Sequence, residues 1–100
     1  AKPVAAPETF YLEQNYPNPF NPTTTIRYQV FEASPVTLTI FNLRGERVQT
    51  LVNAEFKPAG SYSLSWNGKD QEGRSVPSGI YLYRLEAGGT QQVKKMTCMK

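Results

Sequence analysis

The stretch Ser78-Gly79-Ile80-Tyr81-Leu82-Tyr83-Arg84-Leu85-Glu86-Ala87 decides the fold of this chain. Positions 81, 83 and 85 carry Tyr, Tyr and Leu, while positions 80 and 82 carry Ile and Leu. Both faces of the extended segment are therefore apolar, which is typical of a strand inside a sheet. Gly88-Gly89 follows, and two glycines suit the positive φ angles of a two-residue hairpin turn. We predict that residues 90–100 form a strand paired with 79–87.

Most of the remaining chain alternates apolar and polar residues at the spacing of strands. Such segments lie at 9–15, 23–30, 36–42, 46–52 and 61–66, and we expect residues 53–60 to form a loop. No apolar pattern repeats at helical spacing over a useful length. Short strands separated by turns about every eight to twelve residues predict an all-β, immunoglobulin-like antiparallel β-sandwich of about seven strands. The residues expected to face its core are Ile26, Tyr28, Val30, Val36, Leu38, Ile40, Val48, Leu51, Tyr62, Leu64, Trp66 and Cys98.

Three prolines interrupt the segment Asn15-Tyr16-Pro17-Asn18-Pro19-Phe20-Asn21-Pro22. Each proline fixes its own φ and favours an extended conformation in the preceding residue, so a helix or central strand is excluded here. We expect a stiff crossing whose Tyr16 and Phe20 side chains close one end of the core.

The domain organisation is simple. Residues 1–8 hold two prolines and three alanines without periodicity, which predicts an exposed linker tail, and residues 9–100 make one domain. No apolar run approaches the ~20 residues of a membrane-spanning helix, so we expect no membrane span. Because the chain lacks a starting methionine and a signal segment, we interpret it as a module of a larger protein whose export signal lies upstream.

The composition argues against catalysis. The 100 residues contain no histidine and a single cysteine, which removes the usual nucleophile–base pairs, histidine-based zinc sites and thiolate clusters. We therefore expect no enzymatic activity and no cofactor. The net charge of +3 comes from scattered basic residues and not from a dense stripe with stacking aromatics, so we expect no nucleic-acid partner.

Two clusters of charge allow more than one interpretation. Asp70 and Glu72, followed by a glycine, resemble the start of a calcium loop, but the rest of such a loop is missing, and an Asx-type turn is the favoured interpretation. Lys94, Lys95 and Lys100 follow the last acidic residue of the chain. They either discourage edge-to-edge aggregation of a terminal strand or form an address that a receptor reads, and the residues alone leave both open.

Several runs together resemble one family. Asn15-Tyr-Pro-Asn-Pro-Phe-Asn-Pro-Thr-Thr-Thr-Ile-Arg-Tyr28, the later run from Pro58 to Leu85 and the ending Lys94-Lys-Met96…Lys100 are similar, in order and spacing, to type A C-terminal sorting domains of the type IX secretion system. A related immunoglobulin-like module occurs in flagellar hook-capping proteins, which share the pattern around Trp66-Asn-Gly and Gly79-x-Tyr81. Cys98 departs from the sorting-domain pattern, which more often has an aliphatic residue there.

The resemblance implies a function. The domain would direct an upstream passenger from the periplasm across the outer membrane to the cell surface or medium of a bacterium of the Bacteroidota or a related phylum. Its partners would be the outer-membrane secretion machinery and a sortase-like peptidase that cuts in or before residues 1–8. The recognition residues carried over by position are Gly79, Tyr81, Lys94, Lys95, Met96 and Lys100.

Two other functions are compatible with these residues. The first is an accessory carbohydrate-binding or spacer module of a secreted glycoside hydrolase, and the second is an interaction module of the hook-capping kind. A terminal edge strand would also allow strand addition to a partner.

Overall fold

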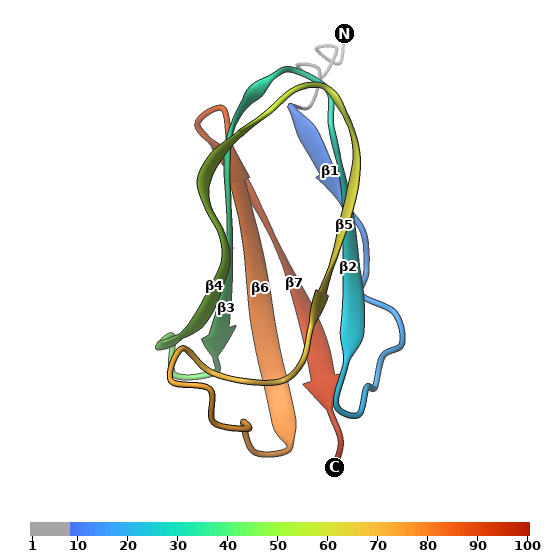
Figure 1. Ribbon diagram of the computed structural model, residues 1–100, viewed down its shortest axis with the longest axis vertical. Coiled ribbons are helices and arrows are strands. Elements are labelled where there is room, and N and C mark those ends of the chain that lie inside the picture. Colours follow the sequence, from blue (N-terminus) through green and yellow to red (C-terminus); the bar gives the residue numbers. More distant parts are fainter. Residues whose placement is uncertain (1–8) are drawn as a thin grey trace, which may run out of the picture.

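The computed structural model describes residues 9–100, and the expected linker at residues 1–8 lies outside them. The described chain forms seven strands and no helix, so the predicted all-β fold with about seven strands is confirmed (Figure 1). Because no helix is present in this range, the described part has none that could cross a membrane. The strands are β1 (Phe10–Leu12), β2 (Thr24–Val30), β3 (Ser34–Asn42), β4 (Arg47–Lys57), β5 (Gly60–Trp66), β6 (Gly79–Ala87) and β7 (Thr90–Cys98).

Two antiparallel sheets form the sandwich. One has the strand order β1-β2-β5 and the other β4-β3-β6-β7. Strand β6 is internal, with β3 on one side and β7 on the other, as its two apolar faces predict. The β6–β7 hairpin runs without a register break from the pair Ala87–Thr90 to the pair Gly79–Cys98, and its turn is Gly88-Gly89. The predicted terminal hairpin is therefore confirmed.

The core lies between the two sheets and follows the predicted alternation. In β2 and β3 the residues expected to face inward are buried, and Trp66 of β5 is buried with them. Leu51, Tyr62 and Leu64 lie at the margin and are only half-buried. The buried apolar side chains are Phe10, Leu12, Phe20, Ile26, Tyr28, Val30, Val36, Leu38, Ile40, Val48, Val52, Trp66, Val76, Tyr81, Tyr83, Leu85, Ala87, Met96 and Cys98.

Strand β4 corrects one expectation. We expected a strand at 46–52 followed by a loop, but β4 continues to Lys57. It stays paired with β3 up to the pair Ser34–Lys57 through several register shifts, and Ala54 adopts a φ of 51°. Residues 53–57 show no alternation of apolar and polar residues, because most of their side chains are exposed. Their strand conformation comes from backbone pairing with β3, which has no signature in the sequence.

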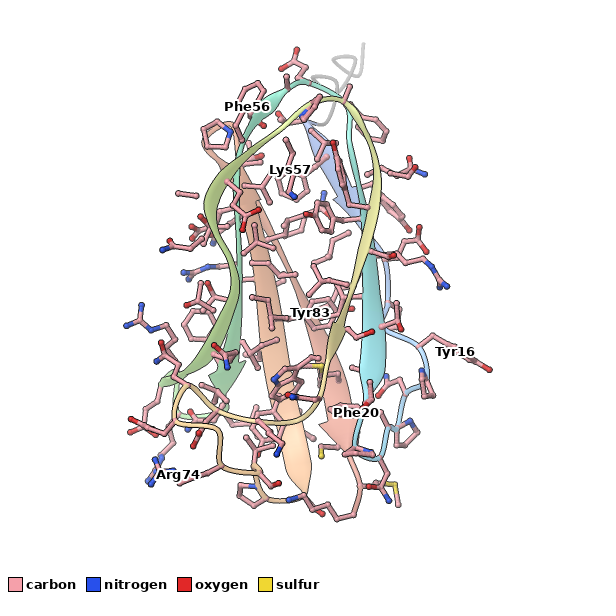
Figure 2. The ribbon with its side chains drawn as sticks, viewed as in Figure 1. Tyr16, Phe20, Phe56, Lys57, Arg74 and Tyr83 are labelled. Atoms are coloured by element: carbon pink, nitrogen blue, oxygen red, sulfur yellow. The ribbon has the colours of Figure 1, made fainter. Side chains whose placement is uncertain are left out.

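The proline-rich crossing at residues 15–22 corrects a second expectation. Phe20 is 2% exposed and packs on Trp66 with ring centroids 5.7 Å apart, as expected, but Tyr16 is 73% exposed and points into solvent (Figure 2). The peptide bonds before all three prolines are cis. The crossing also packs closely on the loop after β5, because a Cβ on Gly68 would lie only 2.9 Å from the Pro22 carbonyl oxygen. Only glycine fits there without a shift.

Tyr83 joins the two sheets at the centre of the molecule (Figure 2). Its side chain is fully buried, and its hydroxyl donates to the Glu13 carbonyl oxygen at 2.7 Å and accepts from the Asn15 backbone N–H at 2.8 Å. These two backbone groups belong to the segment after β1, so one side chain of β6 satisfies polar groups that would otherwise be buried without partners. Burial raises the pKa of Tyr83 to about 12 from an ordinary 10.0.

This bridge makes a testable prediction about stability. Tyr83→Phe should lower the free energy of unfolding by about 1–3 kcal/mol at neutral pH, because the Glu13 and Asn15 groups lose their partner in the core. The raised pKa means that the folded state favours the neutral phenol. Its stabilisation is therefore complete below pH 10 and is lost as the pH rises towards 12.

Urea unfolding at neutral pH and at several alkaline pH values checks this. Tyr16→Phe is the matched control, since it removes an exposed hydroxyl and should leave stability unchanged. Equal unfolding midpoints for the two variants would contradict the bridge.

Candidate functional site

Strand β7 forms one edge of the four-stranded sheet and carries three of the six sequence-predicted recognition residues. Met96 is fully buried, and Tyr81 of β6, its partner in the register, is 5% exposed. Lys95 and Lys100 are exposed, and Lys94 is half-buried opposite Tyr83. The structure therefore brings these residues to one hairpin and its end, but it separates them into core residues and surface lysines.

Tyr81 and Gly79 have structural roles that explain their identity. The Tyr81 hydroxyl donates to the Pro77 carbonyl oxygen at 2.7 Å, and its ring contacts Trp66 edge-on with centroids 5.8 Å apart. Burial raises the pKa of the Tyr81 phenol above its ordinary value. Gly79 has a φ of 154°, which L side chains rarely adopt, although nothing lies within 4 Å of a Cβ added there. Backbone conformation, and not lack of space, favours glycine at this position.

The proline-rich crossing covers the C-terminal part of the β7 edge that faces away from β6, around Thr97 and Met99. The backbone N–H of Thr97 donates to Asn18 Oδ1 at 2.9 Å, and the Thr97 carbonyl oxygen accepts from Phe20 N at 3.0 Å. Met99 N donates to the Phe20 carbonyl oxygen at 2.9 Å. The crossing thus lies beside β7 as a short parallel partner, with Phe20 opposite Cys98.

Two glutamine side chains also tie β7 to the first sheet and its crossing. Gln14 Nε2 donates to the Lys95 carbonyl oxygen at 2.7 Å. The Gln92 amide bridges from β7 to the edge of β1, because its Oε1 accepts from Leu12 N and its Nε2 donates to the Phe10 carbonyl oxygen, each at 3.0 Å. Sequence reasoning missed both glutamines, since a polar residue in an alternating strand normally predicts solvent contact.

The outer face of the same sheet has a shallow apolar hollow of about 220 Å³. Phe41, Leu82 and Val93 line it, and the Arg84 guanidinium lies over the Phe41 ring at 4.6 Å from the centroid. Arg84 Nε lies 2.8 Å from Glu86 Oε2, but off the line of its N–H bond, so the contact is an ion pair without an aligned hydrogen bond. Because Val93 belongs to β7, the hollow lies directly beside that strand.

The calcium candidates belong to a closed turn. Asp70 Oδ1 accepts from the backbone N–H groups of Glu72 and Arg74 at 3.0 and 2.9 Å, which is the expected Asx-type arrangement. The Arg74 guanidinium reaches Asp70 Oδ2 at 3.2 Å and Glu72 Oε1 at 2.8 Å. In the described part of the chain no group of three or more metal-ligating side chains comes together. Both carboxylates are engaged by Arg74 instead.

The turn predicts a pH dependence. The pKa of Asp70 lies below its ordinary 3.8, chiefly because the Arg74 N–H donates to the ionised carboxylate. The stabilisation is therefore present above the ordinary pKa and is lost as the pH falls below it. Asp70→Asn should lower the melting temperature at neutral pH and have no effect at a pH well below 3.8.

Thermal melts of Glu72→Gln provide the comparison. Its ion pair with Arg74 is exposed on both sides, so this variant should change stability little at either pH. An Asp70→Asn penalty that persists unchanged in acid would contradict the assigned role.

Known proteins resemble this chain in sequence and in fold. Residues 21–91 match the family model of the FlgD Ig-like domain. The basal-body rod modification protein FlgD of Salmonella typhimurium is 41% identical over 63 residues, which is 61% of this chain and 27% of that protein. The chain thus spans about a quarter of the length of this relative.

Two solved structures share the fold at lower identity. Dimeric latent PorU from Porphyromonas gingivalis aligns with a TM-score of 0.75 and 23% identity, over 94% of this chain and 10% of that one. PorZ of the same organism, described as an essential bacterial surface component of the type IX secretion system, aligns with a TM-score of 0.61 and 18% identity, over 87% and 11%. The domain is immunoglobulin-like, and the family match covers most of it: the chain belongs to the FlgD Ig-like domain family.

Proposed function

We propose that this domain is a type A C-terminal sorting domain, which directs an upstream passenger through the type IX secretion system. The observation that carries the proposal is the basic strand β7, which is folded into the sandwich and presents Lys95 on its surface. No acidic residue occurs after Glu86, so the last strand presents only positive charge. The fold likeness to PorU and to PorZ, a component of that system, supports the same role.

The lysines are the residues best placed for recognition. Tyr81 and Met96 face the core and maintain the hairpin, so a receptor would not reach their side chains without unfolding the domain. Lys95 and Lys100 are exposed, and Lys94 is partly so. A folded label also has an energetic advantage, because its backbone entropy is already lost before it binds.

The remaining parts of the proposal follow from this role. The partners would be the outer-membrane secretion machinery, a sortase-like peptidase and the passenger itself. The domain would pass through the periplasm to the cell surface or the medium. It would act without catalysis, since the chain lacks histidine and its single cysteine is buried.

A second candidate is an interaction module of the hook-capping kind. The family match to the FlgD Ig-like domain and the 41% identity to a basal-body rod modification protein favour it. In that role the sandwich would pack within a flagellar assembly, and the basic end of β7 would serve solubility and not recognition.

The experiment that tests the sorting role uses substitution and not deletion. Removal of residues 93–100 would delete the buried Met96 and Cys98 and so disrupt the fold itself. Residues 9–100 fused to a secreted reporter should be exported in a type IX-competent host. Replacement of Lys94, Lys95 and Lys100 by glutamine should reduce export about tenfold or more.

The control removes the same charge elsewhere. Glutamine at Arg27, Arg47 and Lys69, which are exposed outside β7, should leave export unchanged. Thermal melts establish that both triple variants fold. Failure to export the unmodified fusion would favour the hook-capping role, and full export of the β7 variant would rule out lysine recognition.

The carbohydrate-binding alternative receives less support. It needs a planar row of exposed aromatic rings, but the exposed aromatics Tyr11, Tyr16, Phe31 and Phe56 belong to four different segments. Tyr16 and Phe56 point outward from distant parts of the molecule (Figure 2). We expect no retention of the domain on insoluble cellulose, chitin or xylan in a pull-down, and clear retention on any of them would revive this role.

A further inference from the structure

The edge of β7 that faces away from β6 is open between Gln91 and Lys95 (its upper part), in contrast to the part around Thr97 (its lower part). Thr97 directs both its N–H and its carbonyl oxygen away from β6, as its bonds to Asn18 and Phe20 establish. Alternate residues of an antiparallel strand direct these groups to the same side. Since the register of β6 and β7 is unbroken, Gln91, Val93 and Lys95 also direct theirs outward.

Only one of these outward groups has a protein partner in the described chain. The Lys95 carbonyl oxygen accepts from Gln14, whereas the Lys95 N–H and both backbone groups of Gln91 and Val93 have none. Val93 is also 48% exposed, although it is a large apolar side chain beside the Phe41–Leu82 hollow. The edge therefore offers a ladder of donors and acceptors with an apolar contact in its middle.

The charges around this edge select the kind of partner. Lys94 and Lys95 directly follow Val93, and no acid occurs on β7 itself. The nearest carboxylate on the outer face is Glu86, opposite Gln91, which already pairs with Arg84. Glu13 precedes the Gln14 contact, and its own backbone is held by Tyr83 and Arg27. The exposed lysine charge is therefore unmatched and complements a negatively charged segment.

A second copy of this chain fits the edge poorly. Pairing β7 with β7 would place two sets of lysines in one ribbon, and like charges on adjacent strands are destabilising. A strand that alternates acidic and apolar residues would instead place its acids on the face that carries Lys94 and its apolar side chains on the face that carries Val93. It would also add its backbone to the sheet without disturbing β6.

We propose that the Gln91–Lys95 edge of β7 binds an extended acidic segment of another polypeptide by β-strand addition. The added strand becomes the fifth strand of this sheet, on the side of β7 opposite β6. Its apolar side chains cover Val93 on one face of the sheet, and its carboxylates lie beside Lys94 on the opposite face. The inference does not depend on the secretion role, because it concerns the domain alone.

The test uses a blocked synthetic peptide of alternating glutamate and valine, titrated into the isotope-labelled chain at low salt. The expected result is binding that weakens with added salt. Hydrogen exchange should slow at the amides of Gln91, Val93 and Lys95, with no comparable change at Lys94, whose N–H already points to β6. A peptide with lysine in place of glutamate should bind at least tenfold more weakly.

Val93→Pro is the sharpest variant, because proline removes an N–H that points outward and is tolerated on an edge. It should weaken peptide binding at least tenfold, while the matched control Val93→Thr retains binding. Glutamine at Lys94 and Lys95 gives an independent check if the proline variant melts early. It should weaken binding several-fold and reduce the salt dependence.

Four outcomes would overturn the proposal. The first is the absence of binding at millimolar peptide, and the second is protection of amides away from β7. The third is equal binding of the glutamate and lysine peptides. The fourth is a concentration-dependent dimer of the chain without peptide that protects the same amides, since the occupant would then be a second copy.

Discussion

The C-terminal strand is held from both of its edges, and the rest of the structure depends on this restraint. Strand β6 pairs with β7 along its full length on one side. On the other side the chain from Gln14 to Phe20 crosses from the opposite sheet and bonds to Lys95, Thr97 and Met99. Because one segment leaves β1 in the first sheet and ends beside β7 in the second, the two sheets are tied at this side (Figure 1).

An aromatic cluster at the lower end of the core makes the crossing possible. Phe20 packs on Trp66, and Trp66 packs on Tyr81, so the crossing, β5 and β6 meet at three rings. The indole N–H of Trp66 donates to the Lys69 carbonyl oxygen at 2.9 Å, which holds the next loop against the cluster. Each polar tip in this region reaches a backbone carbonyl, so the rings are buried without an unpaired group.

The sequence was informative wherever one face of a strand is buried. Alternation was enough to predict β2 and β3, because burial on one face leaves a period of two. The β6–β7 hairpin was predicted from the two apolar faces of β6 and the Gly88-Gly89 turn. It failed for the end of β4, where Asn53 to Lys57 keep their pairing while most of their side chains stay exposed. Tyr16 and Phe20 look alike in sequence, and only the course of the crossing determines which ring is buried.

The site was less predictable than the fold. The lysines of β7 are visible as charge, but the use of Gln14 and Gln92 as bridges depends on contacts between residues about 80 positions apart. A glutamine that meets solvent and one that meets a distant backbone have the same local pattern. The open part of the edge consists of the backbone groups of Gln91 and Val93 and the Lys95 N–H, which these bridges leave without a protein partner in the described chain, so no local pattern could have predicted it.

These contacts also bear on how shared sequence patterns should be read. Glycine at 79, tyrosine at 81 and methionine at 96 each have a packing or backbone reason within this domain. A sorting domain and a FlgD Ig-like domain would keep such residues alike, since both must fold the same hairpin. Any difference in partner must then arise from what remains accessible, namely the lysines after Glu86 and the open backbone between Gln91 and Lys95. The lower half of that edge is occupied in the folded chain, so a partner that pairs with β7 can do so only at its upper half.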